Sequence, residues 1–338
     1  MADMFSPTDK ATWLAKVEKD LKGRALKELT WSLPEDIEIT PFANAEDLPG
    51  ALSPIRRPNN QWEIGETFIL GDDPKVANQQ LLEALTKGVN SPLVVFSEMP
   101  SEIYLEQLLQ EIHLGYIHLG IQPATPADTQ SVASRMQDYL TKHYTGQPIS
   151  WSLSGVSNTM DASTWKGLLD AGTQSPKLAL VDARPWFGNR EGVVNELSKT
   201  TQGLIQVLET AQATEIDLSQ WIQQVRVQLQ VGTSYFLEIA KIRALKHLMA
   251  NVLQSFQIKE GSLLGIDAYL APQAYGEEIH TNKIRATSMA MSAVIAGVDR
   301  LTVLPSDGEE GAKADGFSRR VARNVQHILM LESHLDHV

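Results

Sequence analysis

From about residue 75 onward, short apolar runs alternate with longer segments in which apolar residues recur at helical spacing. The apolar runs predict strands at 92–96, 116–121, 149–153, 178–181, 263–268 and 300–304. The helical spacing predicts helices at 76–86, 101–110, 129–143, 162–171, 193–211, 282–296 and 317–335, with one very long or two abutting helices at 218–256. Strands this short and this apolar are typical of parallel strands that are buried on both faces and joined by helical crossovers.

This alternation leaves two α/β architectures, a (β/α) barrel and an open doubly wound sheet. A dinucleotide-binding open sheet usually has a glycine-rich turn after its first strand, but Phe96 is followed by Ser97-Glu98-Met99-Pro100. No G-x-x-x-x-G-K-[ST] loop occurs anywhere in the sequence. The pattern therefore favours a TIM-type (β/α)8 barrel.

The first 66 residues have a different pattern. Residues 8–21 predict an amphipathic helix with Thr8 as its cap. Prolines then punctuate the segment 22–66, and each one fixes φ and removes a backbone donor, which prevents helices and central strands. We therefore divide the chain into an N-terminal helix and extended arm at 1–66, which would wrap this chain or a partner, and a barrel at 67–338.

Composition excludes several classes of function. The 338 residues carry a net charge of −12 with no basic patch, so neither nucleic acid nor an anionic membrane surface is an expected partner. The absence of cysteine excludes disulfides, thiolate nucleophiles and Cys-ligated zinc. The sequence shows no signal-peptide pattern and no apolar run long enough to span a membrane, so we expect a cytoplasmic protein.

Polar and aromatic side chains follow the strand predicted at 178–181. Asp182 and Arg184 lie just past its end, where barrels build their sites, and would either hold a polar ligand or pair with each other to fix a loop. Trp186 and Phe187 come next and would line an apolar pocket or plug it. With Tyr269, which would also fill the barrel bore, these residues are the candidates for a substrate cleft.

Two further groups have structural interpretations. Glu238 and Lys241 share a helix face at i,i+3, and with Arg243 nearby we expect a charge network that positions the helix. His327, His334 and His337 fall on one face of the predicted last helix. Two histidines at i,i+3 can ligate a metal, but we assign them no acidic or cysteine partner and expect a solvated face.

Several long motifs resemble, in the right order, those of the methylmalonyl-CoA mutase family. Residues 235–248 resemble its helix FFMEIAKMRAARLL, residues 317–326 resemble FSARIARNTQ, and residues 282–303 resemble the N-x-x-R-x-T-x-x-A-M-x-A-V-x-G-G helix with the strand after it. Pieces of the family's N-terminal arm are matched at 13–14, 19–23, 29–31 and 41–50. The resemblance implies a TIM barrel threaded by a CoA thioester, to which a separate C-terminal domain presents adenosylcobalamin for the interconversion of methylmalonyl-CoA and succinyl-CoA.

The sequence departs from the catalytic members of this family at their site. Residues 62–67 align with the run W-T-I-R-Q-Y, which puts Gly65 at the arginine and Thr67 at the tyrosine. Phe187 takes the place of the active-site histidine, and residues 264–270 replace the substrate-contacting run R-x-H-x-Q-T-S with apolar residues. The resemblance thus implies that no CoA substrate is turned over and that this chain binds no cofactor itself.

Residues 181–185 and 298–303 resemble instead the small subunit of heterodimeric members, which keeps the fold but not the site. The lower-ligand motif D-x-H-x-x-G of the cobalamin-binding domain does not occur. The sequence stops before the family's strand D-P-x-G-G-S-Y-Y-x-E, so we expect a fragment, or a shortened form that lacks the last barrel strand and exposes an edge to a covering segment or a partner.

Taken with the resemblance, these observations predict a non-catalytic, small-subunit-like barrel of the isomerase family that pairs with a catalytic mutase subunit as a heterodimer, or with itself as a homodimer. An active adenosylcobalamin-dependent acyl-CoA mutase of altered specificity, with its cofactor domain on another chain, is the first alternative. A CoA-thioester-binding protein is the second.

Overall fold

The computed structural model describes residues 9–33, 37–44, 47, 55, 59–154, 166–167, 176–188, 192–213, 216–258, 264–308 and 314–337. The chain divides into two compact units. One comprises Met1–Pro54 with Gly188–Asn195, and the other comprises Ile55–Phe187 with Glu196–Val338. The helix predicted at 162–171 lies almost entirely outside the described residues.

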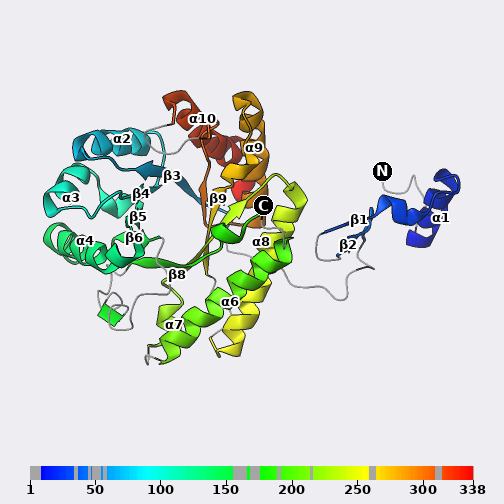
Figure 1. The fold of residues 1–338 in the computed structure, drawn as a ribbon, viewed down its shortest axis with the longest axis horizontal. Helices are drawn as coiled ribbons and strands as arrows, with labels where there is room; N and C mark the ends of the chain where they lie inside the picture. Colours follow the sequence, from blue (N-terminus) through cyan, green and yellow to red (C-terminus); the bar gives the residue numbers. More distant parts are fainter. Residues whose placement is uncertain are drawn as a thin grey trace. The chain divides into compact units, whose positions relative to one another are not determined.

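The larger unit is a closed barrel of parallel strands (Figure 1). Around the barrel the strand order is β10-β3-β4-β5-β6-β7-β8-β9. The strands are β3 (Glu63–Ile69), β4 (Ser91–Val95), β5 (His118–Gln122), β6 (Ser150–Leu153), β7 (Lys177–Asp182), β8 (Val225–Val231), β9 (Gly265–Leu270) and β10 (Arg300–Thr302). β10 closes the ring, because Arg300 lies opposite Glu63 of β3 on one side and Asp267 of β9 on the other. The predicted TIM-type fold is confirmed.

Helices surround the strands (Figure 1). They are α2 (Pro74–Thr86), α3 (Glu102–Leu108), α4 (Thr129–His143), α6 (Gly192–Ala213), α7 (Leu218–Trp221), α8 (Tyr235–Ser255), α9 (Ile279–Ala296) and α10 (Gly316–His327). The outward side chains of the strands, such as Leu119, Val227 and Leu301, are buried against apolar side chains of these helices, including Leu208 and Ile242. This layer between barrel and helices is the hydrophobic core.

Two strands differ from the sequence prediction. β3 begins at Glu63, inside the range assigned to the arm, and β8 lies within the range 218–256 that was predicted to be helical. In β8, apolar residues alternate strictly with Arg226, Gln228 and Gln230. The short helix α7 before it and the 21-residue helix α8 after it hid this period-2 pattern, and its polar positions face the barrel interior rather than solvent. With both strands present the barrel is closed, so the expectation of an open barrel lacking its last strand is wrong.

The smaller unit has little core of its own. It contains α1 (Lys10–Asp20), capped by Asp9, a short 3-10 turn (Leu26–Leu29), and a two-stranded antiparallel ladder of β1 (Trp31–Ser32) and β2 (Glu38–Ile39). Trp13 stacks on Phe42 with ring centroids 4.5 Å apart. Among its described residues only Leu21 is buried, whereas the Trp31 side chain is 58% exposed. No helix in the described part of the chain is long and apolar enough to cross a membrane.

Asn60 connects the start of the barrel to two later segments. Its side-chain amide donates hydrogen bonds to the carbonyl oxygens of Val294 and Leu335, each at 2.8 Å, and its backbone N–H donates to the Asp336 carbonyl at 3.1 Å. Asn60 is buried, so removing the amide takes a buried hydrogen bond from each carbonyl group. The Val294 carbonyl keeps a second donor, the Gly297 N–H at 3.0 Å, whereas the Leu335 carbonyl loses its side-chain donor.

We expect Asn60→Ala to lower the free energy of unfolding by about 1–3 kcal/mol, because a buried polar group that loses its hydrogen bond costs about that much. The exposed neighbour Asn59 is the matched control, and Asn59→Ala is expected to change stability by less than about 1 kcal/mol. Urea unfolding of both variants measures the difference. Equal destabilisation by the two substitutions would contradict this role for Asn60.

Candidate functional site

Four of the five predicted cleft residues come from the end of β7 and the turn that follows it. Arg184 Nε and Nη2 donate to Asp182 Oδ1 and Oδ2, each at 2.8 Å, and the Arg184 backbone N–H donates to Oδ1 at 3.1 Å. The two side chains are 21% and 27% exposed. This bidentate pair closes the turn on itself, which matches the loop-fixing interpretation of the two residues.

Tyr269 comes from β9, and its ring lies against the Arg184 side chain of the turn after β7. The Arg184 guanidinium carbon lies 4.9 Å from the centroid of the Tyr269 ring, a cation–π contact that links the ends of β7 and β9. Trp186 instead lies against α6, where its ring is 3.8 Å from the position that a Cβ on Gly203 would occupy. The structure thus brings Asp182, Arg184 and Tyr269 together and places Trp186 elsewhere.

Phe187 packs over a buried charge network. Its ring centroid is 4.8 Å from Lys241 Nζ, and a Cβ on Gly232 would lie only 2.7 Å from its Cζ, so the ring needs a glycine beneath it. Lys241 Nζ lies 2.8 Å from Glu238 Oε2 and 3.1 Å from Glu196 Oε1. Burial raises the pKa of Glu196, an effect that Lys241 partly offsets.

This network confirms the predicted pairing of Glu238 with Lys241 and adds Glu196, whose carboxylate comes from α6. Arg243 is not part of it, since its guanidinium donates to the Ile295 carbonyl at 3.3 Å. Phe187 therefore covers a structural ion cluster.

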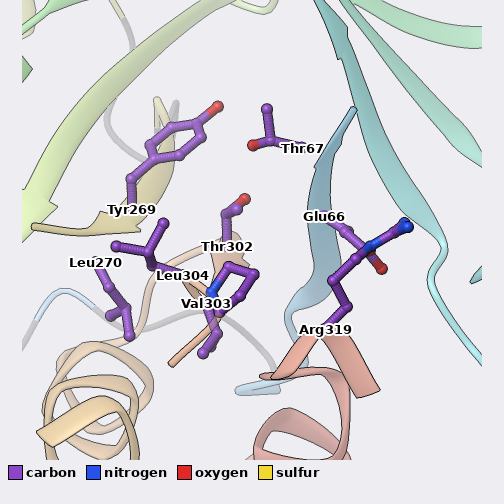
Figure 2. A pocket seen from close by; sticks show the side chains of 9 residues that line it. Glu66, Thr67, Tyr269, Leu270, Thr302, Val303, Leu304 and Arg319 are labelled. Atoms are coloured by element: carbon purple, nitrogen blue, oxygen red, sulfur yellow. The ribbon is translucent and has the colours of Figure 1, made fainter. Parts of the chain in front are cut away.

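A pocket of about 330 Å³, a volume that includes space open to solvent, lies at the carboxyl ends of β3, β9 and β10 (Figure 2). Its lining consists of Glu66, Thr67, Tyr269, Leu270, Thr302, Val303, Leu304, Pro305 and Arg319. Figure 2 shows Glu66 and Arg319 together on one side and Tyr269 on the other. Arg319 Nε donates to Glu66 Oε1 at 2.7 Å, and Arg323 Nη1 donates to Oε2 at 2.8 Å. The charges that line the pocket are therefore already paired with each other.

Gly65 has no room for a side chain. A Cβ there would lie 2.4 Å from Thr302 Oγ1 and 2.9 Å from the Leu301 carbonyl oxygen, a backbone atom that cannot move aside easily. An arginine at this position would displace β10 from β3. Thr67 lies on the same face of β3, where it is nearly buried in the pocket wall.

Charged side chains fill the interior of the barrel below this pocket. Arg226 Nε donates to Asp267 Oδ1 at 2.8 Å, and the Arg300 guanidinium donates to the other carboxylate oxygen. Arg300 also reaches Ser91 Oγ at 3.4 Å, although β3 separates their strands in the sheet. Only side chains that cross the interior can make such a contact. Asp267 is fully buried and Arg300 is 1% exposed.

Polar side chains continue this network towards the pocket. Gln228 Nε2 donates to the Tyr269 hydroxyl at 3.1 Å and to Ser154 Oγ at 2.9 Å. Burial raises the pKa of Tyr269, which keeps its phenol neutral. Tyr269 therefore bridges the interior network and the ion pair at the end of β7.

The interior charges set the protonation states around them. Burial alone would raise the pKa of Asp267, but Arg226 and Arg300 outweigh it and lower that pKa. Burial, followed by the positive charges of Arg300 and Arg226, lowers the pKa of His118 well below its usual value of 6.5. His118 Nδ1 lies 2.7 Å from Ser150 Oγ. A neutral imidazole thus lies beside two buried guanidinium groups.

The sequence prediction missed Arg226, Asp267 and Arg300. The three residues are far apart along the chain and each lies in a short, mostly apolar stretch. The alternation of β8 was the available signal, because Arg226, Gln228 and Gln230 occupy every second position of an otherwise apolar strand and therefore share its inward face.

We expect Asp267→Asn to lower the free energy of unfolding by about 3–5 kcal/mol, because it leaves two buried guanidinium charges without a counter-ion. Asp182→Asn removes the partner of a partly exposed arginine and is expected to cost about 1 kcal/mol or less. Chemical denaturation of both variants at neutral pH compares them. A similar loss in the two proteins would contradict the central role of Asp267.

The lowered pKa of His118 in the folded protein implies that stability depends on pH. Below the usual value of about 6.5, the unfolded chain takes up a proton that the folded barrel does not, so stability falls as the pH falls. The wild-type protein is expected to lose unfolding free energy when the pH is lowered from about 7 to about 5. In His118→Gln we expect this loss to be about 1–2 kcal/mol smaller than in the wild type. Urea unfolding at the two pH values measures this. The exposed His280→Gln serves as the control, and a wild-type pH dependence in His118→Gln would refute the assignment.

Comparison with known proteins agrees with the resemblance. Residues 192–338 match the family model described as methylmalonyl-CoA mutase. The chain is 26% identical to the methylmalonyl-CoA mutase small subunit of Porphyromonas gingivalis, with 99% of this chain and 59% of that protein covered. Identity to the small subunit of Streptomyces virginiae is 24% (96% and 56% covered), and to that of Propionibacterium freudenreichii subsp. shermanii 22% (100% and 58% covered).

The chain thus spans less than three fifths of the length of these relatives, while they cover 96–100% of it. The matched segments include the barrel strands from β8 to β10 and the helices between them. The chain therefore resembles the methylmalonyl-CoA mutase family over residues 192–338, and over most of its length it is similar to the small subunits named for that mutase.

Proposed function

We propose that this chain is a non-catalytic, small-subunit-like barrel that supports a catalytic methylmalonyl-CoA mutase subunit. The observation that carries the proposal is the occupied barrel interior. The family resemblance implies a CoA thioester threaded through the bore, yet here Arg226, Asp267 and Arg300 cross that space and are almost fully buried. Opening such a path would expose or break a buried ion network, which is strongly unfavourable.

The positions of the lost catalytic residues support the same proposal. The space beside Gly65 is taken by Thr302 and the Leu301 carbonyl, so an arginine has no place there. Phe187 is held over Lys241 and Gly232 in a packed environment rather than directed into the pocket. Gly65 and Phe187 both lie in close packing with their neighbours. Replacing either one with the residue of the catalytic subunit would therefore not restore a catalytic site.

The residues of this chain do not fit adenosylcobalamin. The D-x-H-x-x-G run does not occur in the 338 residues. Among the described strands the only histidine is His118, which lies at the start of β5, buried and in contact with Ser150. In this proposal, cobalamin and the isomerisation of methylmalonyl-CoA and succinyl-CoA belong to the partner subunit, in the cytoplasm.

The N-terminal unit supports the existence of a partner. A two-stranded ladder and one short helix are marginal on their own, and this unit buries a single described residue. Trp31 is 58% exposed and Phe42 is 40% exposed. Exposed aromatic side chains of this kind are the usual anchors of protein–protein interfaces. We assign the catalytic subunit as the protein that this surface contacts.

The test is co-purification of the full 338-residue chain with the catalytic mutase subunit of the same organism. We expect a heterodimer by size-exclusion chromatography with light scattering, and isomerase activity only when the catalytic subunit is present. Trp31→Ala is expected to weaken the complex at least about tenfold, as buried aromatic anchors do, while the exposed Tyr116→Ala of the barrel leaves it unchanged.

Three outcomes would overturn the proposal. A chain that does not associate with the catalytic subunit and leaves its activity unchanged is not a supporting subunit. Turnover of an acyl-CoA by this chain, given a separate cobalamin-binding chain, would identify it as a mutase of altered specificity. Saturable binding of CoA or an acyl-CoA by calorimetry, without turnover, would identify a CoA-thioester-binding protein.

A further inference from the structure

The segment after α10 leaves the α-helical path. A π-helical turn at Ile328–Glu332 is followed by a 3-10 turn at Leu335–His337. Between them His334 has a φ of 51°, in the left-handed region that non-glycine residues rarely adopt. The helix predicted to reach residue 335 therefore ends earlier. His327 is separated from the other two histidines and lies 3.1 Å from the Lys87 carbonyl oxygen.

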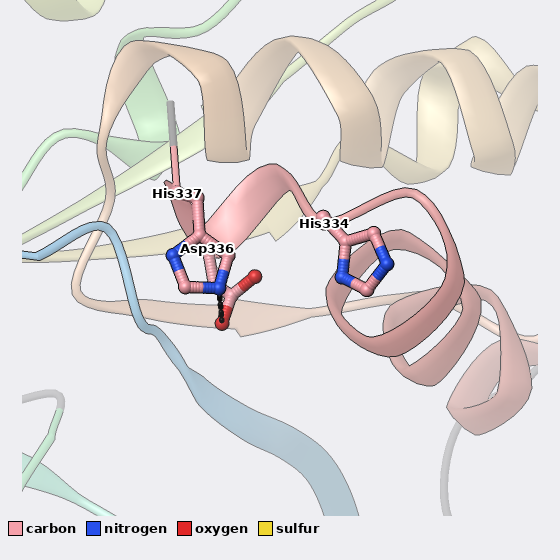
Figure 3. A group of neighbouring side chains, drawn as sticks. All are labelled: His334, Asp336 and His337. Carbon is pink, nitrogen blue, oxygen red and sulfur yellow. Dashed lines mark ion pairs between the residues drawn. The ribbon is translucent and has the colours of Figure 1, made fainter.

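This change of path brings a carboxylate between two imidazoles (Figure 3). One ligand-type atom from each of His334, Asp336 and His337 lies within 4.8 Å of the others. His337 Nε2 is 3.6 Å from Asp336 Oδ2. The acidic partner that the sequence interpretation did not assign to these histidines is thus Asp336, placed beside them by the turn.

We propose that His334, Asp336 and His337 bind a divalent transition-metal ion of the zinc type. Imidazole nitrogen and carboxylate oxygen are ordinary zinc ligands, with bonds of about 2.0–2.2 Å in a tetrahedral arrangement. Ligand atoms around such an ion lie roughly 3.4 Å apart, so rotation of the exposed imidazoles closes the set. Two nitrogen ligands favour zinc, cobalt or nickel over magnesium or calcium, which prefer oxygen alone.

Asp336 is the fixed member of the site. Its backbone carbonyl accepts a hydrogen bond from the Asn60 N–H at 3.1 Å, and the adjacent Leu335 carbonyl accepts one from the Asn60 amide at 2.8 Å. Asp336 Oδ1 is buried and accepts no hydrogen bond from any described residue. A buried carboxylate oxygen without a partner is unfavourable, and a bound cation would satisfy it.

His334 and His337 are the ligands whose side chains are free to rotate towards the ion. The His337 side chain is 76% exposed, against 13% for Asp336, and His334 is also exposed. This side of the cluster faces solvent, so water can complete a fourth position, as in zinc sites with three protein ligands.

The cluster lies near the amino-terminal ends of the strands, because its partner Asn60 lies three residues before Glu63, the first residue of β3. The pocket lined by Glu66 and Tyr269 is at the opposite, carboxyl ends. Residues at the amino-terminal face of a barrel serve stability rather than chemistry. The ion would therefore clamp the segment 334–337 to the base of the barrel. This inference does not depend on the proposed function.

The experiment uses the tag-free 338-residue chain after removal of metals with a chelator. We expect one equivalent of Co²⁺ to produce the visible absorption of a four-coordinate ion, and Zn²⁺ to displace it. Zn²⁺ should also raise the thermal unfolding midpoint. Loss of even an outer partner of a metal site costs about 10–100-fold in affinity, so His334→Ala, His337→Ala and Asp336→Asn should each weaken Zn²⁺ binding at least about tenfold.

His280→Ala is the matched control, because it removes an exposed histidine from α9, and its Zn²⁺ affinity should equal that of the wild type. Circular dichroism without metal verifies that every variant is folded. No saturable uptake of Co²⁺ or Zn²⁺ by the wild type would overturn the proposal. Undiminished uptake by the double variant His334→Ala/His337→Ala would do so as well, since the ion would then bind elsewhere.

Discussion

The Asp267 carboxylate, held between the guanidinium groups of Arg226 and Arg300, determines what the inside of this barrel can contain. A buried carboxylate is stable only beside positive charges, and two buried arginines in turn require further hydrogen-bond acceptors for their N–H groups. Ser91 meets this need, because its hydroxyl lies near Arg300 and donates to the carboxylate of Glu63 at 3.0 Å. The strands that carry these residues are fixed relative to one another by charge as well as by backbone hydrogen bonds.

The interior of this barrel is filled by buried, paired charges and serves as a structural element. Thr302 occupies the space beside Gly65, and the Phe187 ring packs where Gly232 has no side chain. Beneath Phe187, Lys241 is paired with Glu196 and Glu238. Each contact depends on its neighbour, so the packing of the site positions and the ion network inside the barrel form one coupled arrangement.

The barrel itself was predictable because alternating apolar strands and amphipathic helices are a local signal. The interior network was not predictable, since it joins β8, β9 and β10 through side chains that have no common motif. β8 was not recognised as a strand, because its inward positions are polar and it lies between helices. The pairing of Asp182 with Arg184 was foreseen from two adjacent residues. Asp336 was missed because a regular helix would have directed it away from the histidines, and only the left-handed turn at His334 reverses this.

β10 is the shortest strand of the barrel and the last of its strands in sequence, yet it pairs with the first barrel strand, β3. Contacts between distant parts of a chain form late in folding, because the entropy of closing the intervening loop must be overcome first. During synthesis, β3 has an unpaired edge until Arg300–Thr302 has left the ribosome. The nascent chain is therefore open to wrong strand pairing while the segment between β3 and β10 is made, and chaperones have a defined edge to protect.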